Sequence, residues 1–117
     1  MKLLVTGGAG FIGSHVIRSW LAAHPDDTVV NLDVLTYAGS RERLADLKSH
    51  PGYRFVHGDI CDSAAVRKAI DGVETVIHCA AETHVDRSIT DAAPFLRTNV
   101  EGTYTLLQGA RDRGVKR

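Results

Sequence analysis

Four short apolar runs with strand character alternate along the chain with segments of helical spacing. The predicted strands span residues 2–6, 28–33, 53–57 and 75–79. Because strands that alternate with helices form parallel sheets covered by helices on both faces, this order predicts an α/β fold. A doubly wound parallel sheet has the strand order 3-2-1-4-5-6, so these four strands would form its 3-2-1-4 part, a truncated version of the full sheet.

Apolar residues at helical spacing predict a helix after each strand. The first should begin near Phe11, and a weaker second helix follows Ser40. Asp62 or Ser63 can cap the third. The last and longest helix is expected over residues 92–113, with Gly102 and Gly109 compensated by close packing. Its candidate packing positions are Phe95, Val100, Tyr104, Leu107 and Ala110.

Charge and cysteine content narrow the functional classes. Lys plus Arg equals Asp plus Glu, at 14 each, so the chain lacks the broad basic surface that nucleic acid or an anionic membrane selects. Cys61 and Cys79 stand outside any Cys/His spacing of a metal site. No apolar run has the length of a signal peptide or a membrane span. We therefore expect a cytoplasmic protein with no metal, nucleic-acid or membrane partner.

A glycine-rich turn lies between the first predicted strand and the first predicted helix. It satisfies both Gly8-x-Gly10-x-x-Gly13 and the wider Gly7-x-x-Gly10-x-x-Gly13. Glycines allow a tight turn and a close approach of backbone to a pyrophosphate, which free N–H groups at the helix N-terminus can bind. Glycine-rich turns without a ligand are common. Here, however, the turn follows a buried-strand pattern, and Asp33 ends the second strand about 20 residues after Gly13, so we predict a dinucleotide site.

Asp33 indicates which dinucleotide is bound. Its carboxylate can accept hydrogen bonds from the adenosine ribose, whereas a 2′-phosphate about 4 Å away would be repelled by roughly 1–4 kcal/mol per charge pair. NAD is therefore expected rather than NADP. The alternative interpretation is a capping Asp without a ligand. A P-loop is excluded because the chain has no Gly-Lys-Ser/Thr.

Two further segments follow predicted strands, at the edge where open α/β sheets bind ligands. After the third strand, Asp59 could accept the adenine amino group while Ile60 packs on the ring, or the two could be a turn residue and a core residue. His78, inside the fourth strand, is interpreted as a core histidine with satisfied hydrogen bonds. The polar residues 82–88 could form a solvated loop or contact a substrate.

These residues, in this order, resemble the extended short-chain dehydrogenase/reductases, whose fingerprint is Thr-Gly-x-x-Gly-x-x-Gly. Within that family, four segments are similar to those of dTDP-glucose 4,6-dehydratases. They are residues 33–39, 57–60, 80–89 and 98–103. Residues 82–88 discriminate most, and the resemblance covers the whole chain. It departs from the usual pattern at Val34, where Lys is common, and at Thr83, where Ser is common.

The resemblance implies a Rossmann-type NAD-binding domain. Residues 1–117 would be its N-terminal part, with the rest of the domain and a substrate domain outside this chain. Phe11 and Ile12 would contact the pyrophosphate through their backbone, and His84 would lie on the substrate side. The other assigned positions lie near the ends of the strands or on the last helix. With the glycines of the turn, the predicted cofactor-binding residues are Gly7, Gly10, Phe11, Ile12, Gly13, Asp33, Val34, Leu35, Thr36, Asp59, Ile60, Ala80, Ala81, Thr83 and Thr98.

The resemblance also implies a reaction. Enzymes of this kind are homodimeric lyases of deoxysugar biosynthesis that use NAD to convert dTDP-glucose to dTDP-4-keto-6-deoxyglucose with loss of water. Their Tyr-x-x-x-Lys pair has no counterpart in residues 1–117, because Tyr37, Tyr53 and Tyr104 lack a Lys four residues later. We therefore assign no catalytic residue and expect these residues alone to be inactive. The alternatives are another nucleotide-sugar epimerase or decarboxylase of this family, and a non-catalytic NAD-binding module.

Overall fold

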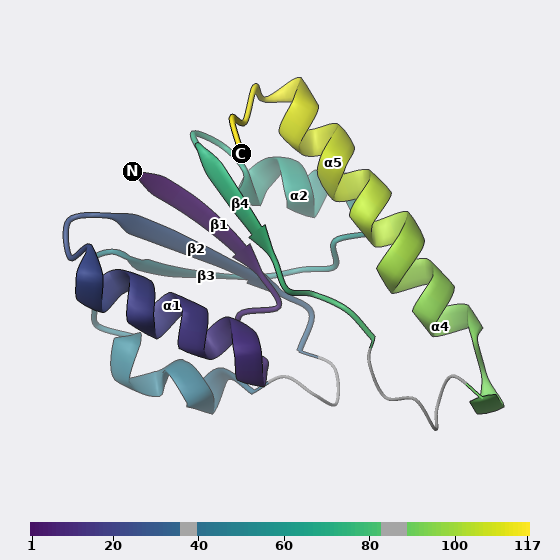
Figure 1. The fold of residues 1–117 in the computed structure, drawn as a ribbon, viewed down its shortest axis with the longest axis horizontal. Helices are drawn as coiled ribbons and strands as arrows, with labels where there is room; N and C mark the ends of the chain where they lie inside the picture. Colours follow the sequence, from purple (N-terminus) through teal and green to yellow (C-terminus); the bar gives the residue numbers. More distant parts are fainter. Residues whose placement is uncertain (36–39, 83–88) are drawn as a thin grey trace.

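The computed structural model describes residues 1–35, 40–82 and 89–117. Four strands form one parallel sheet in the order β3-β2-β1-β4, which confirms the predicted topology (Figure 1). They are β1 (Lys2–Thr6), β2 (Thr28–Asp33), β3 (Tyr53–His57) and β4 (Thr75–His78). Because the strands run in the same direction, their carboxyl ends meet at the edge where such sheets bind ligands.

Helices follow the strands at the predicted places. They are α1 (Phe11–Ala23), η1 (Arg41–Leu47), α2 (Ser63–Ala69), α4 (Ala93–Leu96), η2 (Arg97–Gly102) and α5 (Thr103–Asp112). Ser40 caps η1, a 3-10 helix, and Asp62 caps α2 by accepting the N–H of Ala64 at 3.0 Å. The last three segments follow one another directly, with η2 as a π-helical middle, and correspond to the single long helix predicted from the sequence.

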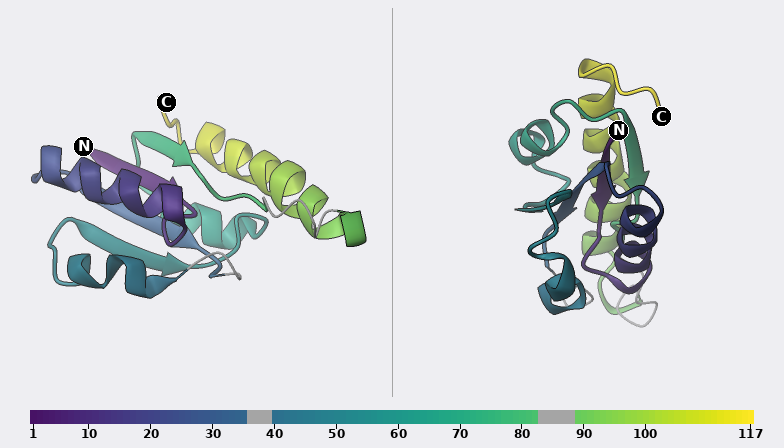
Figure 2. Two further views of the ribbon diagram at one scale, coloured as in Figure 1. Left: turned by 60° about the horizontal axis from the view of Figure 1, so that its bottom comes forward. Right: turned by 90° about the vertical axis from the view of Figure 1, so that its left-hand side faces the viewer.

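Alternation of side chains along the strands builds an apolar layer on each face of the sheet. On one face the core is Leu3, Val5, Ile17, Leu21, Val29 and Leu44. On the other it is Leu4, Val30, Leu32, Ile60, Val66, Ala69, Ile70, Val73 and Leu106. Figure 2 shows α1 and α2 on opposite sides of the sheet. Burial of each large side chain contributes about 1.5–3 kcal/mol, so the sheet is held from both faces.

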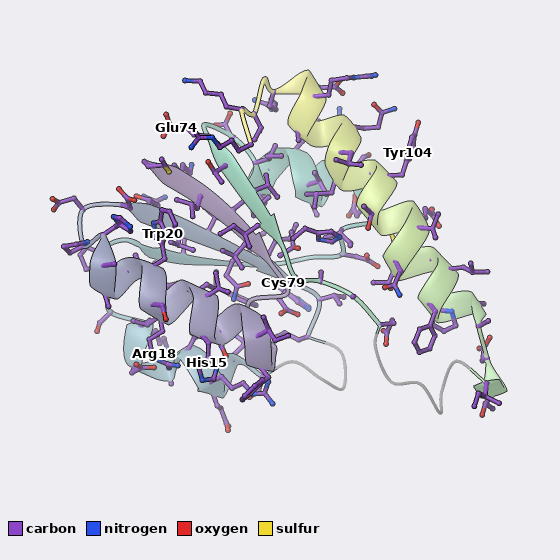
Figure 3. The ribbon with its side chains drawn as sticks, in the orientation of Figure 1. His15, Arg18, Trp20, Glu74, Cys79 and Tyr104 are labelled. Atoms are coloured by element: carbon purple, nitrogen blue, oxygen red, sulfur yellow. The ribbon has the colours of Figure 1, made fainter. Side chains whose placement is uncertain are left out.

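The buried face of the last helix differs from the prediction. Val100, Tyr104 and Leu107 are 63%, 61% and 64% exposed, so these three predicted packing positions do not pack against the described part of this chain. Figure 3 shows Tyr104 pointing away from the sheet. The buried face instead contains Gly102 and Gly109. A Cβ added at Gly102 would lie 2.6 Å from Ile60, and one at Gly109 would lie 2.6 Å from Val66. The predicted close packing of these glycines is therefore confirmed.

The last residues of the chain lie beside β4. The N–H of Val76 donates to the carbonyl of Arg117 at 2.8 Å, and the N–H of Lys116 donates to the carbonyl of Glu74 at 3.1 Å. The chain thus returns to the outer side of β4 after the last helix. In the part of the chain that the structure describes, no helix combines the length and apolar character needed to cross a membrane.

Candidate functional site

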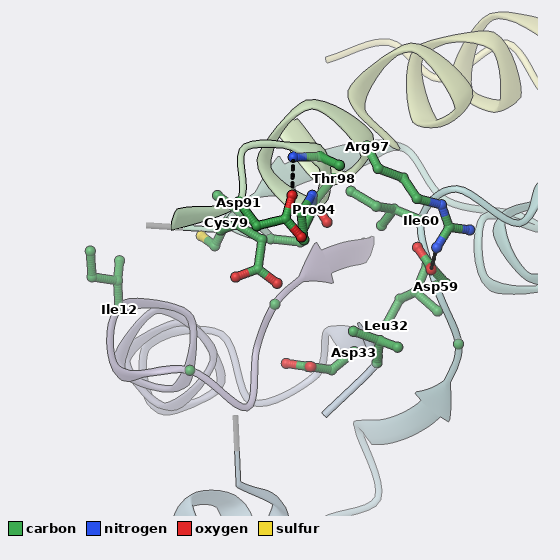
Figure 4. A pocket seen from close by; sticks show the side chains of 18 residues that line it. Ile12, Leu32, Asp33, Asp59, Ile60, Cys79, Asp91, Pro94, Arg97 and Thr98 are labelled. Carbon is green, nitrogen blue, oxygen red and sulfur yellow. Dashed lines mark hydrogen bonds and ion pairs between the residues drawn. The ribbon is translucent and has the colours of Figure 1, made fainter. Parts of the chain in front are cut away.

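A cavity of about 630 Å³ opens at the carboxyl edge of the sheet (Figure 4). The turn after β1, the ends of β2 and β3, the residues after β4 and the start of the last helix all contribute to its lining. Segments far apart in the sequence therefore converge on one site. The predicted cofactor-binding residues that line it are Gly7, Gly10, Ile12, Asp33, Val34, Asp59, Ile60, Ala80, Ala81 and Thr98.

The other predicted residues lie near the cavity or outside the described part of the chain. Phe11 is 69% exposed at the start of α1, and Gly13 is buried within that helix. Leu35 follows Asp33 in a left-handed conformation with a φ of 59°, and its N–H donates to Asp33 Oδ1 at 2.8 Å. None of these three lines the cavity. Thr36, Thr83 and His84 lie outside the described residues.

The glycine turn brings β1 against β4. Gly7 has a φ of +70°, and a Cβ added there would lie 2.7 Å from the backbone of Ala80. A Cβ at Gly13 would overlap the backbone of Gly7 and Gly8. A side chain at either position would therefore push apart the turn, the first helix and the end of β4. This is the close packing that the glycine spacing predicted.

Hydrogen bonding within the turn determines which N–H groups face the cavity edge. The N–H groups of residues 7–10 all have acceptors within the protein. In order these are Leu32 O at 2.9 Å, Asn31 Oδ1 at 2.9 Å, Asp33 Oδ2 at 2.8 Å and Gly7 O at 3.1 Å. The next three N–H groups, of residues 11–13, have no acceptor among the described residues, whereas Ser14 donates to Gly10 O. Residues 11–13 therefore offer the free donors of the α1 N-terminus to an anion.

Carboxylates dominate the charge around the cavity. Asp33, Asp59, Glu82 and Asp91 line it, and Arg97 is the one cationic side chain among its described lining residues. An anionic ligand must therefore depend on backbone N–H groups more than on side-chain cations. The same acidic surroundings oppose an additional phosphate near Asp33.

Asp59 is held on both carboxylate oxygens. Its Oδ1 accepts the N–H of Cys61 at 2.8 Å, and its Oδ2 lies 3.4 Å from Arg97 (Figure 4). Partial burial and then the charge of Asp59 raise the pKa of the Cys61 thiol to about 11, so Cys61 stays protonated at neutral pH. Asp59 thus has the turn role proposed for it and also lines the cavity, and Ile60 belongs to the core and lines the cavity as well.

Two threonines and His78 join the end of β4 to its neighbours. Thr6 Oγ1 lies 2.6 Å from His78 Nδ1 and accepts the N–H groups of Cys79 and Ala80 at 3.1 and 3.2 Å. His78 Nε2 lies 2.9 Å from Thr103 Oγ1, which donates to a helix carbonyl. Because Thr6 Oγ1 accepts two N–H groups, its own hydrogen points to His78, so these contacts fit a neutral imidazole that accepts at Nδ1 and donates at Nε2. Partial burial accordingly lowers the pKa of His78.

His78 is therefore satisfied in its hydrogen bonds, as predicted, but it is not a core residue. Its side chain is partly buried and keeps a substantial exposed surface. A second link holds the segment just after β4: Asn99 Oδ1 accepts the N–H of Glu82 at 2.9 Å, and Asn99 Nδ2 donates to the Glu82 carbonyl at 3.0 Å. This pair of bonds ties the cavity wall to the π-helical segment η2.

Comparison with known proteins assigns the chain to a family. A model described as the NAD dependent epimerase/dehydratase family matches residues 3–117. The chain belongs to this family. The family description names NAD, the cofactor predicted from Asp33 and the glycine turn. It also agrees with the resemblance to extended short-chain dehydrogenase/reductases found in the sequence.

Individual members of the family show the same relationship. A low-salt glycan biosynthesis protein of Haloferax volcanii is 53% identical over 117 residues, which cover all of this chain and 37% of the relative. A dTDP-glucose 4,6-dehydratase of Streptomyces griseus is 54% identical over 115 residues, or 97% of this chain and 35% of the relative. The chain thus spans about a third of the length of the curated relatives it matches.

A solved structure gives the same result for the fold. The crystal structure of DesIV, a dTDP-glucose 4,6-dehydratase from Streptomyces venezuelae, with NAD and TYD bound, superposes with a TM-score of 0.94. The two sequences are 57% identical, and the match covers 99% of this chain and 37% of that chain. The α/β topology described above is therefore that of this family's members.

The residues present fit the NAD of the family description. Gly10 has no side chain that could stand between the free N–H groups of residues 11–13 and the cavity. A Cβ added at Gly10 would meet only Gly7 O, at 3.2 Å. Asp33, only 8% exposed, lines the cavity. Ala80 and Ala81 contribute small side chains to the lining, and the backbone of Ala80 lies directly beside Gly7. Donors for a pyrophosphate, an acceptor for a ribose and a smooth wall for a ring are thus adjacent.

Sequence reasoning missed several residues of this site. Arg97 and Asp91 line the cavity, and Asn31 supports the glycine turn. Asn31 could have been noticed as a polar residue in an apolar strand, two positions before Asp33 and therefore on the same face. Arg97 carries no such local signal, because its contact with Asp59 depends on how the last helix packs.

Proposed function

We propose that the protein carrying this chain is a dTDP-glucose 4,6-dehydratase, a lyase that converts dTDP-glucose to dTDP-4-keto-6-deoxyglucose with loss of water in deoxysugar biosynthesis. The observation that supports this most is the hydrogen bonding of the glycine turn. The N–H groups of residues 7–10 have acceptors within the protein, whereas those of residues 11–13 are free to bind an anion beside Asp33. Membership of the family and the identity to named dehydratases support the choice of reaction.

In this proposal the chain supplies the adenosine and pyrophosphate half of the NAD site. The N–H groups of Phe11 and Ile12 bind the pyrophosphate, and Asp33 accepts the ribose hydroxyls. Val34, Leu35 and Thr36 complete the ribose side, while Asp59 and Ile60 contact the adenine. Ala80, Ala81, Thr83 and Thr98 support the inner half of the cofactor. NAD bound here would supply the hydride acceptor for oxidation at C4 of the sugar and the hydride donor at C6 after water is lost across C5 and C6.

The remaining parts of the proposal concern the whole protein. His84 would contact the sugar nucleotide. The residues that move protons would be the Tyr-x-x-x-Lys pair and, for the elimination, a Thr-Asp-Glu group, neither of which residues 1–117 contain. Residues 1–117 would be the N-terminal part of the NAD-binding domain and would be inactive alone. We further propose that the protein is cytoplasmic and that it is a homodimer. The dimer is supported by the exposed side chains of Val100, Tyr104 and Leu107, which form an apolar stripe on the last helix.

The competing candidates are another nucleotide-sugar enzyme of the same family and an NAD-binding module without catalysis. The family description covers epimerases as well as dehydratases, which keeps the first candidate in the test. The purified protein should convert dTDP-glucose, with loss of water seen as a product 18 mass units lighter, and should act poorly on UDP-glucose. Epimerised UDP-sugar with no dehydration would support the epimerase instead, and NAD binding without turnover of either sugar would support the module.

The proposed substrate contact has its own test. His84→Ala should raise KM for dTDP-glucose and leave the Kd for NAD nearly unchanged, because the residue is assigned to the sugar side of the site. Unchanged kinetics in a folded variant would remove His84 from the substrate site. Ser88→Ala, in the same segment but without an assigned contact, is the matched control.

A further inference from the structure

Asn31 is a fully buried polar residue in the middle of β2. Asn31 is 0% exposed, and its register partners in the sheet are the apolar residues Val5 on β1 and Phe55 on β3. Oδ1 accepts the N–H of Gly8 at 2.9 Å, and Nδ2 donates to the hydroxyl of Tyr53 on β3 at 3.1 Å. A chain of hydrogen bonds therefore runs from β3 through β2 to the glycine turn. Both ends of the Asn31 amide are used, which defines the orientation of its side chain.

Gly8 is packed directly against this amide. A Cβ added at Gly8 would overlap the side chains of Asn31 and Ile17. The backbone of the turn is thus held between a strand and the first helix at this point. Asn31 itself does not line the cavity, so it can influence a ligand only through the turn.

The effect of the Asn31 contact follows from the order of the donors. The Asn31 amide oxygen accepts the N–H of Gly8. Asp33, two residues later on the same strand, accepts the N–H of Ala9. The turn then enters α1 with the N–H groups of Phe11 and Ile12 free. Without the Asn31 amide, the buried N–H of Gly8 would have to find another acceptor, and the turn would shift to provide one. Such a shift would also move the donors of Phe11 and Ile12.

We propose that Asn31, held in place by Tyr53, is a positioning residue that aligns the α1 N–H groups with the cofactor pyrophosphate. The proposal rests on the proposed function in one respect, that the site binds NAD. A positioning role predicts an effect that depends on the phosphates of the ligand. Adenosine, which lacks them, should be less affected than ADP or NAD.

The test compares three variants of the natural protein that carries this chain. Asn31→Leu removes both hydrogen bonds, Tyr53→Phe removes only the support of the amide, and Val29→Ala is the control. Val29 is fully buried on the same strand and face, two residues before Asn31, and its N–H donates to Gly52 O rather than to the turn. Binding of NAD, ADP and adenosine is measured by calorimetric or NMR titration, and protection of the Gly8 amide by hydrogen exchange.

Asn31→Leu should raise the Kd for NAD and ADP about three- to tenfold, the range that the loss of one net hydrogen bond gives, with less than a twofold change for adenosine. Tyr53→Phe should raise both Kd values by a smaller factor and speed exchange at Gly8. Val29→Ala should lower Tm without changing any Kd. If Asn31→Leu does not fold, Tyr53→Phe and the Gly8 exchange rate decide the question.

Two results would overturn the inference while leaving the proposed function intact. The first is that the wild-type protein binds NAD, and that an Asn31→Leu or Tyr53→Phe variant has the wild-type Kd for NAD and the wild-type protection of the Gly8 amide. The other is an equal loss of affinity for adenosine, ADP and NAD, which would indicate a general loss of structure. A wild-type protein that binds no NAD would instead overturn the proposed function, and the inference with it.

Discussion

The carboxylate of Asp33 accepts the backbone N–H of Ala9 at 2.8 Å. The residue expected to bind the cofactor ribose therefore also holds the glycine turn in which the pyrophosphate donors begin. Its second oxygen accepts the N–H of Leu35, also at 2.8 Å. Each carboxylate oxygen can accept more than one hydrogen bond, so these contacts leave capacity for the ribose hydroxyls.

Asp33→Ala should weaken NAD binding and narrow the advantage of NAD over NADP. Loss of hydrogen bonds to a charged group is worth about 1.5–3 kcal/mol, or roughly a 10- to 100-fold rise in the Kd for NAD. The Kd for NADP should rise less, because the repulsion of its 2′-phosphate is removed as well. Both constants can be measured by titration calorimetry. Tighter binding of NADP than NAD by the wild-type protein would show that the ribose assignment is wrong.

Gly7 and Gly114 allow a matched test of the turn. Both have positive φ, +70° and +67°, but a Cβ at Gly114 would meet nothing within 4 Å. Gly114→Ala should lower the free energy of unfolding by about 1–2 kcal/mol, the cost of left-handed backbone alone. Gly7→Ala should lower it by a further 1–3 kcal/mol or so, because its Cβ would overlap Ala80. Equal losses in urea denaturation would show that the turn moves aside freely.

The sheet and the turn could be predicted from the sequence because their signals are local. Residues 2–6 and 28–33 carry strand patterns of their own, and the glycine spacing is read directly from residues 7–13. The link from Tyr53 through Asn31 to Gly8 could not be predicted in this way, since it joins two strands and a turn through their register.

The buried face of the last helix could not be predicted correctly from the sequence. The large residues Val100, Tyr104 and Leu107 suggested the buried face, but the face that packs on Ile60 and Val66 contains glycines. An apolar stripe indicates that a surface is buried somewhere, without specifying whether this chain or another one covers it.

Asn99→Ala should loosen the wall of the cavity after β4. The variant loses both hydrogen bonds to the backbone of Glu82, so amide exchange at Glu82 should become faster. Because the site is exposed, we expect a loss of only about 1 kcal/mol in the free energy of unfolding. Asn99→Asp keeps the acceptor for the Glu82 N–H and should give an intermediate exchange rate. Wild-type exchange at Glu82 in Asn99→Ala would show that other contacts hold this segment.

His78 should make the stability of the protein depend on pH. Burial lowers its pKa from the ordinary value of 6.5, so at mildly acidic pH the unfolded chain binds the proton more readily than the folded one. The contribution of neutral His78 is therefore fully present above about pH 6.5 and is lost as the pH falls below that value, through the lowered folded pKa. Protonation would also place a second donor against Thr6, whose oxygen already accepts two N–H groups.

The variant that isolates this effect is His78→Gln, which has no titrating group. Urea denaturation of wild type and variant between pH 5 and pH 8 should show a smaller acid-side loss of stability in His78→Gln, because the other histidines contribute equally to both proteins. Thr103→Val, which removes the acceptor for His78 Nε2 without changing charge, should lower stability at all these pH values and keep the wild-type slope. If the free energy of unfolding of wild type and of His78→Gln falls by the same amount between pH 7.5 and pH 5, protonation of His78 does not destabilise the fold, and its contact with Thr6 does not depend on a neutral imidazole.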